Sequence, residues 1–169
     1  MEDVFPTIRG NTGTKFHKGA NTLFNNLVEF APGITDAKVD GYDGARPIEI
    51  ELAVRRDLNG YIIPSTRTDL PAAPNNLTEV KVPAGRADVL RRQAMYAGAV
   101  GARGMFELRN YGNETLVYNG NAYTLVPAYH AGMEHNYGIP RAESLRIVKC
   151  KIGAAGTPSE DAMYTLAPL

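Results

Sequence analysis

The sequence predicts an α+β fold that is mainly β: a compact antiparallel β sandwich or barrel-like sheet with one main helix and extended arms. Short apolar runs recur between turn residues, which is typical of antiparallel strands. One segment, about residues 84–100, carries an apolar face at helical spacing. Residues 1–19 and 156–169 lack the periodicity of core elements, so we expect two arms around a single domain at residues 20–155.

Composition limits the classes of function. A chain of 169 residues is long enough for one domain with a sizeable core, and 44% hydrophobic residues exclude full disorder. The single Cys cannot form an internal disulfide. With 18 basic and 18 acidic side chains the net charge is +0, which argues against a generally basic nucleic-acid-binding protein. The acidic start has no secretory signal pattern, and no apolar run is long enough for a membrane span.

The first elements are predicted from periodicity and turn residues. Apolar side chains at helical spacing predict a short helix over about residues 21–30, which a Pro-Gly pair ends. Alternating apolar and polar residues predict a strand over residues 46–54. Asn59-Gly60 predicts a turn into a second strand at residues 61–63. Residues 64–76, rich in Pro and Asn, are expected to form a long surface loop.

The middle of the chain is predicted to hold one strand and the main helix. Val80 and Val82 share a face of the expected strand at residues 77–82. The main helix follows, and its glycine-rich end at residues 98–104 is expected to terminate it.

The remainder of the domain is predicted to be β. Asn119-Gly120 lies between two β-branched and aromatic runs and is the strongest hairpin signal in the chain. A second long loop is expected at residues 127–143, and a capping box predicts a short helix near residues 158–164. The predicted strands are residues 105–110, 114–118, 122–126 and 144–152.

Two clusters of Asp, Glu or His residues are candidates for metal binding. His130, Glu134 and His135 suggest a small metal- or ligand-binding, enzyme-like module, but the two His are five apart and Gly132 interrupts them, so the helical zinc spacing is not met. The second cluster lacks the alternation and final Glu of a calcium loop, and an Asp-Gly turn explains it better. Its members are Asp36, Asp40 and Asp43.

No nucleophile motif is present. The Ser residues, Ser65, Ser144 and Ser159, lie outside any Gly-x-Ser-x-Gly elbow. Cys150 falls inside an alternating strand pattern, which predicts a buried structural thiol. The glycine series after the main helix lacks the Lys-Ser/Thr ending of a phosphate-binding loop. We therefore expect a protein that is not an enzyme and needs no cofactor.

A set of arginines suggests another function. Arg86, Arg91 and Arg92 lie largely off the apolar face of the main helix, which fits a nucleic-acid-associated domain. Interspersed acidic residues and the lack of an aromatic-rich RNA-binding run favour an ordinary solvated or interface face instead. The other members of the set are Arg55, Arg56, Arg103 and Arg109.

The arms suggest assembly with other proteins. They carry apolar residues that a free monomer would expose, and zero net charge removes long-range self-repulsion. In its Gly/Asn/Ala/Pro-rich β composition, its arms and its lack of catalytic motifs, the chain is similar to small virion proteins of bacteriophages. The apolar arm residues predicted to interact are Phe5, Ile8, Phe16, Leu166 and Leu169.

The expected function is therefore structural. We expect a capsid, capsid-decorating or tail-associated subunit that stabilises a larger particle through arm and loop contacts. Its partners would be like subunits or other particle proteins, without a membrane and without a nucleic-acid ligand. The expected location is the virion, assembled in the host cytoplasm.

Overall fold

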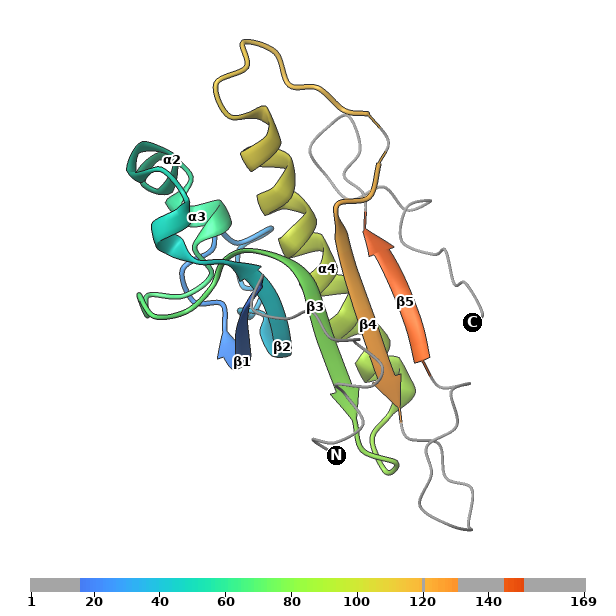
Figure 1. Ribbon diagram of the computed structural model, residues 1–169. Coiled ribbons are helices and arrows are strands. Elements are labelled where there is room, and N and C mark those ends of the chain that lie inside the picture. The colour runs from blue at the N-terminus through green and yellow to red at the C-terminus, as the bar shows by residue number, and fades with distance from the viewer. Residues whose placement is uncertain (1–15, 120, 131–144, 151–169) are drawn as a thin grey trace.

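Five strands form one mixed sheet in chain order, seen in Figure 1. They are β1 (His17–Leu23), β2 (Lys38–Ala45), β3 (Ala72–Lys81), β4 (Thr124–His130) and β5 (Leu145–Cys150). Neighbouring strands are antiparallel except β3 and β4, which are parallel. This computed structural model describes residues 16–119 and 121–130 and the backbone of residues 145–150.

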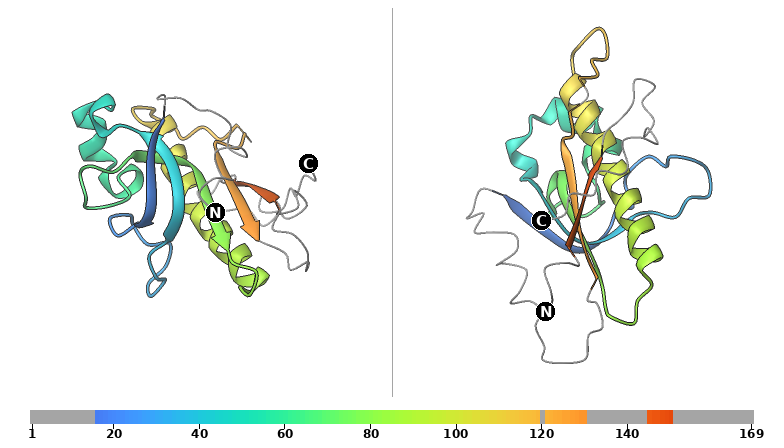
Figure 2. Two further views of the ribbon diagram at one scale, coloured as in Figure 1. Left: turned by 60° about the horizontal axis from the view of Figure 1, so that its bottom comes forward. Right: turned by 90° about the vertical axis from the view of Figure 1, so that its right-hand side faces the viewer.

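The parallel pair requires a crossover, which α4 (Ala87–Asn110) supplies. This helix connects β3 to β4 and packs against both strands, on one side of the sheet (Figure 2). A 3-10 turn, η1 (Pro47–Glu49), and two short helices, α2 (Leu52–Asp57) and α3 (Asn59–Ile62), lie between β2 and β3. Of these, α3 contacts the helix α4.

The main core lies between α4 and the sheet. Leu77 and Val126 from the sheet are fully buried beside Ala94 and Ala97 from the helix. At the β1–β2 end, the rings of Phe24 and Tyr42 meet edge to face at 5.2 Å. The Tyr42 hydroxyl donates a hydrogen bond to the Pro71 carbonyl at 3.3 Å, and burial raises its pKa to about 12.

The predicted helix at residues 21–30 is wrong. Residues up to Leu23 pair along β2, and Asn21 has φ of +46°, which a right-handed helix does not allow. His17–Gly19, assigned from sequence to the N-terminal arm, also belong to β1. Pairing with a distant segment outweighed the helical spacing of a few apolar residues.

The predicted strands at residues 46–54 and 61–63 are also wrong, because this stretch is helical. Pro47 opens the 3-10 turn, and the Glu49 carboxylate accepts the Arg46 amide at 3.1 Å in a capping arrangement. Ile48, expected on the buried face of a strand, is 85% exposed. Asn59-Gly60 begins α3 instead of a hairpin turn.

The predicted strand at residues 77–82 is confirmed, but β3 begins earlier, at Ala72, inside the expected loop. A proline in an interior strand removes a ladder hydrogen bond. Pro74 is accommodated because the register between β2 and β3 shifts there, from Asp43 opposite Asn76 to Ala45 opposite Ala72. The loop prediction missed this irregular strand.

The main helix is confirmed, but its predicted end is wrong. It runs through the glycines to Asn110, so the predicted strand at residues 105–110 is helix. Residues 114–118 form no strand, and the hairpin predicted at Asn119-Gly120 is therefore absent from the described residues. The last strand of the core is confirmed as β5, and residues 122–126 are strand only from Thr124.

The fold is thus mixed α/β, with one mixed sheet and one main helix. The described strands form a single sheet, not a closed barrel, and the β3–β4 pair is parallel where an antiparallel architecture was predicted. Most of the predicted loop at residues 127–143, the helix at residues 158–164 and most of both arms lie outside the described residues. Within the described part, no helix has the length and apolar character needed to cross a membrane.

Candidate interaction surface

The segment between α4 and β4 exposes a run of apolar side chains. Residues 111–119 are all exposed, and Leu116, Val117 and Tyr118 are 67%, 52% and 41% exposed. Figure 1 shows this segment running beyond the end of α4 before it returns to β4. We call Leu116, Val117 and Tyr118 the apolar tip. Large exposed apolar patches are candidates for contact surfaces, so the apolar tip is the first site to consider.

The backbone of the apolar tip is held by Asn110, the last residue of α4. The Asn110 amide donates to the Val117 carbonyl at 3.4 Å, and its Oδ1 accepts the Val117 amide at 2.6 Å. The same amide group donates to the Phe106 carbonyl at 2.9 Å. Because Asn110 is itself buried, these bonds tie the tip to the helix end while the Val117 side chain stays exposed.

Both legs of the segment are anchored as well. On the outgoing leg, the Tyr111 hydroxyl donates to the Asp57 carboxylate at 2.6 Å, and this bond raises the Tyr111 pKa. On the returning leg, the Arg109 guanidinium lies 4.1 Å from the centre of the Tyr123 ring. Asn119 donates to the Tyr123 hydroxyl at 2.7 Å. The apolar tip is therefore presented on a segment bound to α2 and α4.

Further apolar side chains are exposed on other elements. Ile48 and Leu52 lie on η1 and α2. Phe16, a predicted interaction residue, is exposed directly before β1. The strand β1 is the sheet edge, so one side of its backbone has no partner strand within the described sheet. The other predicted apolar residues, Phe5, Ile8, Leu166 and Leu169, lie outside the described residues.

The predicted arginine cluster is partly neutralised. Arg86 binds the Asp88 carboxylate with two hydrogen bonds of 2.9 Å, and Arg92 lies 3.1 Å from the same carboxylate. Arg91 is exposed on the same helix. Because Asp88 serves two of the three guanidinium groups, this face resembles an ordinary charged helix surface more than a phosphate-binding stripe.

Arg103 from the same set has an internal role. Its guanidinium lies 4.0 Å from the centre of the Phe30 ring and donates to the carbonyls of Val28 and Glu29. It therefore fastens the loop between β1 and β2 to the middle of α4. Burial lowers the Arg103 pKa, which is the expected direction for a cation taken out of water.

The candidate metal residues do not converge in the described part of the chain. His130 donates from Nε2 to the Gly85 carbonyl at 2.8 Å, and Glu134 and His135 lie outside the described residues. Asp40 accepts the Val80 amide at 2.8 Å, while Asp43 accepts from Asn76. No three His, Cys, Asp or Glu side chains in the described ranges are grouped to hold a metal ion.

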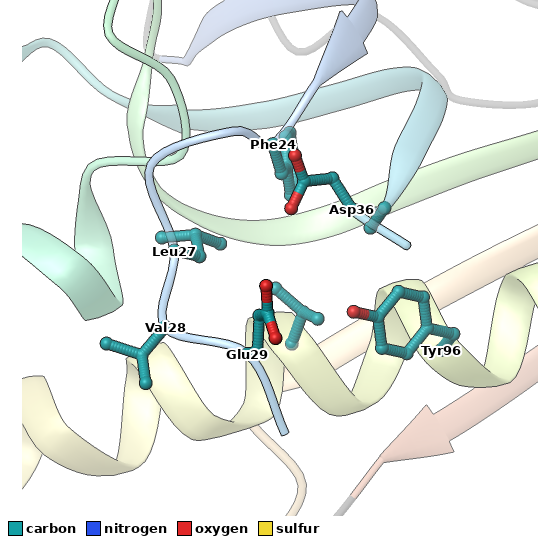
Figure 3. Close-up of a pocket in the computed structure, with 8 residues that line it drawn as sticks. Phe24, Leu27, Val28, Glu29, Asp36 and Tyr96 are labelled. Atoms are coloured by element: carbon teal, nitrogen blue, oxygen red, sulfur yellow. The ribbon is translucent and has the colours of Figure 1, made fainter. Parts of the chain in front are cut away.

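A small crevice lies between α4 and the β1–β2 loop (Figure 3). Glu29 and Asp36 from the loop and Tyr96 from the helix lie around it, with Phe24 and Leu27. Burial, followed by the charges of Asp36 and Glu29, raises the Tyr96 pKa. The crevice volume of about 10 Å³ holds a water molecule but no organic substrate.

The apolar tip was missed from sequence. Leu116 and its neighbours were predicted to be a strand, because a β-branched and aromatic run has the same pattern in a buried strand and an exposed loop. The only sequence signal against a strand was the polar stretch at residues 110–114. Searches of known protein families, curated proteins and solved structures found no match to this chain.

Proposed function

We propose that the protein is a non-enzymatic structural subunit that associates with copies of itself through the apolar tip. The observation that carries this proposal is the combination of exposed side chains and a held backbone: Leu116 is 67% exposed, and its neighbour Val117 is tied to Asn110. An apolar loop without function would gain stability by folding its side chains inward. Here the hydrogen bonds keep the tip outward.

The energetics favour docking of such a tip on a neighbour. Burying a large apolar side chain contributes roughly 1.5–3 kcal/mol when burial is complete. The tip is already anchored through Asn110, Tyr111 and Tyr123, so little additional backbone ordering is needed on binding. In a symmetric assembly every subunit repeats the same contact, so the modest free energies of many contacts add up to a stable particle.

The sequence supports one kind of particle in this proposal. The similarity of composition to small bacteriophage virion proteins supports a capsid, capsid-decorating or tail-associated role. A net charge of +0 supports close packing of identical subunits, since long-range repulsion between them is small. The mechanism is passive: apolar surface is buried between subunits and no reaction is catalysed.

The full-length chain tests this proposal by its mass in solution. Mass photometry and light scattering should find an oligomer that dissociates in the double variant Leu116→Ser/Tyr118→Ser. The matched control, Ile34→Ser/Val82→Ser, changes two other exposed apolar residues and should leave the oligomer intact. Circular dichroism should be the same for all three proteins, because the altered side chains are exposed.

Three results would overturn the proposal. One is a wild-type chain that stays monomeric at every concentration up to the millimolar range. Another is an oligomer that the Leu116→Ser/Tyr118→Ser variant forms as tightly as the wild type. The third is equal dissociation in both double variants, which would assign assembly to general surface hydrophobicity and not to the tip.

A further inference from the structure

A cleft of about 430 Å³ lies between α2, α3 and the segment that leads into β3. Its volume falls in the range of pockets that hold small organic ligands. Three arginines, Arg55, Arg56 and Arg67, line it, and no Asp or Glu is among the lining residues. We propose that this cleft binds a small organic phosphate, with the phosphate group on the arginines.

Two of these arginines have N–H donors without a partner among the described residues. Arg55 donates from Nε to the Ile50 carbonyl at 3.0 Å, which orients the side chain and leaves its two terminal nitrogens without a partner among the described residues. Arg56 is exposed and has no hydrogen-bond or ion-pair partner within the described part of the chain. Unpaired guanidinium groups that converge on one cleft produce a positive local potential, which attracts anions.

Arg67 is paired, but weakly. Its Nε and Nη2 donate to the Asp69 carboxylate at 3.2 and 2.7 Å, and this contact lowers the Asp69 pKa. Both side chains are mostly exposed, so the pair contributes little to stability and is easily exchanged. An anionic ligand can therefore recruit Arg67 without breaking a buried contact.

The number of arginines favours phosphate over carboxylate. A carboxylate offers two oxygens in one plane, which a single guanidinium fork satisfies. A phosphate monoester offers three terminal oxygens and up to two negative charges, which suits several guanidinium groups from different directions. Here Arg55 and Arg56 come from α2 and Arg67 from the segment after α3. Ser65 and Thr68 add hydroxyl donors to the same cleft.

The cleft also has an apolar part, which indicates an organic ester and not the inorganic ion. Leu52, Ile63 and Leu70 line it together with the arginines. Leu52, the first residue of α2, is half exposed. An apolar group attached to the phosphate would cover these side chains. This inference uses none of the residues of the apolar tip and stands independently of the proposed assembly.

Phenyl phosphate is a suitable probe, titrated into the full-length chain by calorimetry in a phosphate-free, low-salt buffer. We expect saturable binding of one probe per chain. Arg56→Gln should weaken it about tenfold, the effect of losing one charge-assisted hydrogen bond. Arg92→Gln removes the same charge from an exposed position on α4 outside the cleft and should change the affinity less than about twofold.

Companion titrations separate the parts of the proposal. Absence of saturable phenyl phosphate binding, or an equal loss in Arg56→Gln and Arg92→Gln, would overturn the site. Benzoate that binds as tightly as phenyl phosphate would overturn the assignment to phosphate. Inorganic phosphate that binds as tightly would overturn the role of the apolar part. Phenol should not bind, because it lacks the charge.

Discussion

The two halves of α4 pack against the same sheet in different ways. Near the start of the helix, a buried carboxyl, Glu79, stands two residues before the end of β3, and charged side chains such as Asp88 and Arg92 cover the outside. Toward the end, Phe106 and Leu108 still pack into the core, but glycines also bring the helix backbone against its neighbours. A Cβ on Gly104 would lie 2.5 Å from the Tyr61 carbonyl, and one on Gly101 would lie 2.9 Å from Thr124 Cγ2.

The difference between the two halves explains why α4 contains glycines in its interior. Glycine in a helix interior costs about 1 kcal/mol relative to alanine, which is why it predicts a helix end. In α4 that cost is offset because α3 and the sheet approach the helix backbone too closely for any side chain at Gly101 or Gly104. At these two glycines the backbone of the second half lies directly against the sheet and α3.

Substitution of Gly104 by Ala should have the largest effect. The added Cβ meets the Tyr61 backbone carbonyl, which cannot rotate away, so we expect Gly104→Ala to lower the free energy of unfolding by about 3 kcal/mol. Gly101→Ala should cost less, because two of its three nearest atoms belong to side chains. Urea denaturation measures both. A stabilised Gly104→Ala protein would mean that the helix and α3 are not in close contact.

The buried carboxyl of Glu79 on β3 should make the stability of the fold depend on pH. Burial, and then the charge of Asp40, raises the pKa of Glu79 to about 7 from an ordinary 4.5. The folded state therefore holds this proton more tightly than the unfolded state. Its contribution to stability is full below pH 4.5 and is lost as pH rises to about 7, by up to about 3 kcal/mol.

Glu79→Gln should remove this loss. The variant is expected to match the wild type near pH 4 and to exceed its stability at pH 8, measured as free energies of unfolding across the range. Glu107→Gln, which removes one carboxylate from α4, controls for net charge. A constant difference between Glu79→Gln and wild type at all pH values would contradict the assignment.

The end of the second half should depend on Asn110. Asn110→Ala removes the hydrogen bonds to Phe106 and Val117, so we expect a loss of about 2 kcal/mol in the free energy of unfolding. Hydrogen exchange should accelerate at the Val117 amide more than in the middle of α4. Asn25→Ala, which removes exposed hydrogen bonds to Thr66 in another part of the fold, is the control. Unchanged exchange at Val117 would show that the tip is held by other contacts.

The smallest effect is expected at the start of the helix. Asp88→Asn removes the acceptor shared by Arg86 and Arg92, but all three side chains are largely exposed. Exposed ion pairs are screened by water and salt, so thermal unfolding should be unchanged within error. A loss comparable with that of Asn110→Ala would mean that the two ends are fixed by similar interactions.

Prediction from sequence succeeded where local pattern and tertiary environment agree. The start of α4 was recognised because its apolar face has helical spacing and packs against the sheet. The strand around Leu77 was recognised because its local pattern agrees with its place in the sheet. The strand β5 was recognised from its alternating apolar and polar residues. The stretch at residues 46–54 failed because alternation alone cannot distinguish a strand from a capped helical turn with exposed Ile48.

The candidate sites also divide into features that the local sequence predicts and features that depend on tertiary contacts. Arg55 and Arg56 were identified as members of a basic set, but their meeting with Arg67 depends on how α2 and the following segment fold back. The apolar tip was assigned to a strand because a run of three apolar residues does not reveal whether their side chains are buried or exposed. Asn110 carries no sequence signal, since its role depends on a contact with Val117, seven residues later.

The sequence by itself determined the properties that add up residue by residue. These are the net charge of +0, the lack of an internal disulfide, and the apolar periodicity that predicts the start of α4 near Ala87 and the strand β5. Tertiary structure alone decided the parallel pairing of β3 with β4 and the continuation of the helix past Gly101. The physical reason is that close contacts between distant segments outweigh local propensities of about 1 kcal/mol per residue.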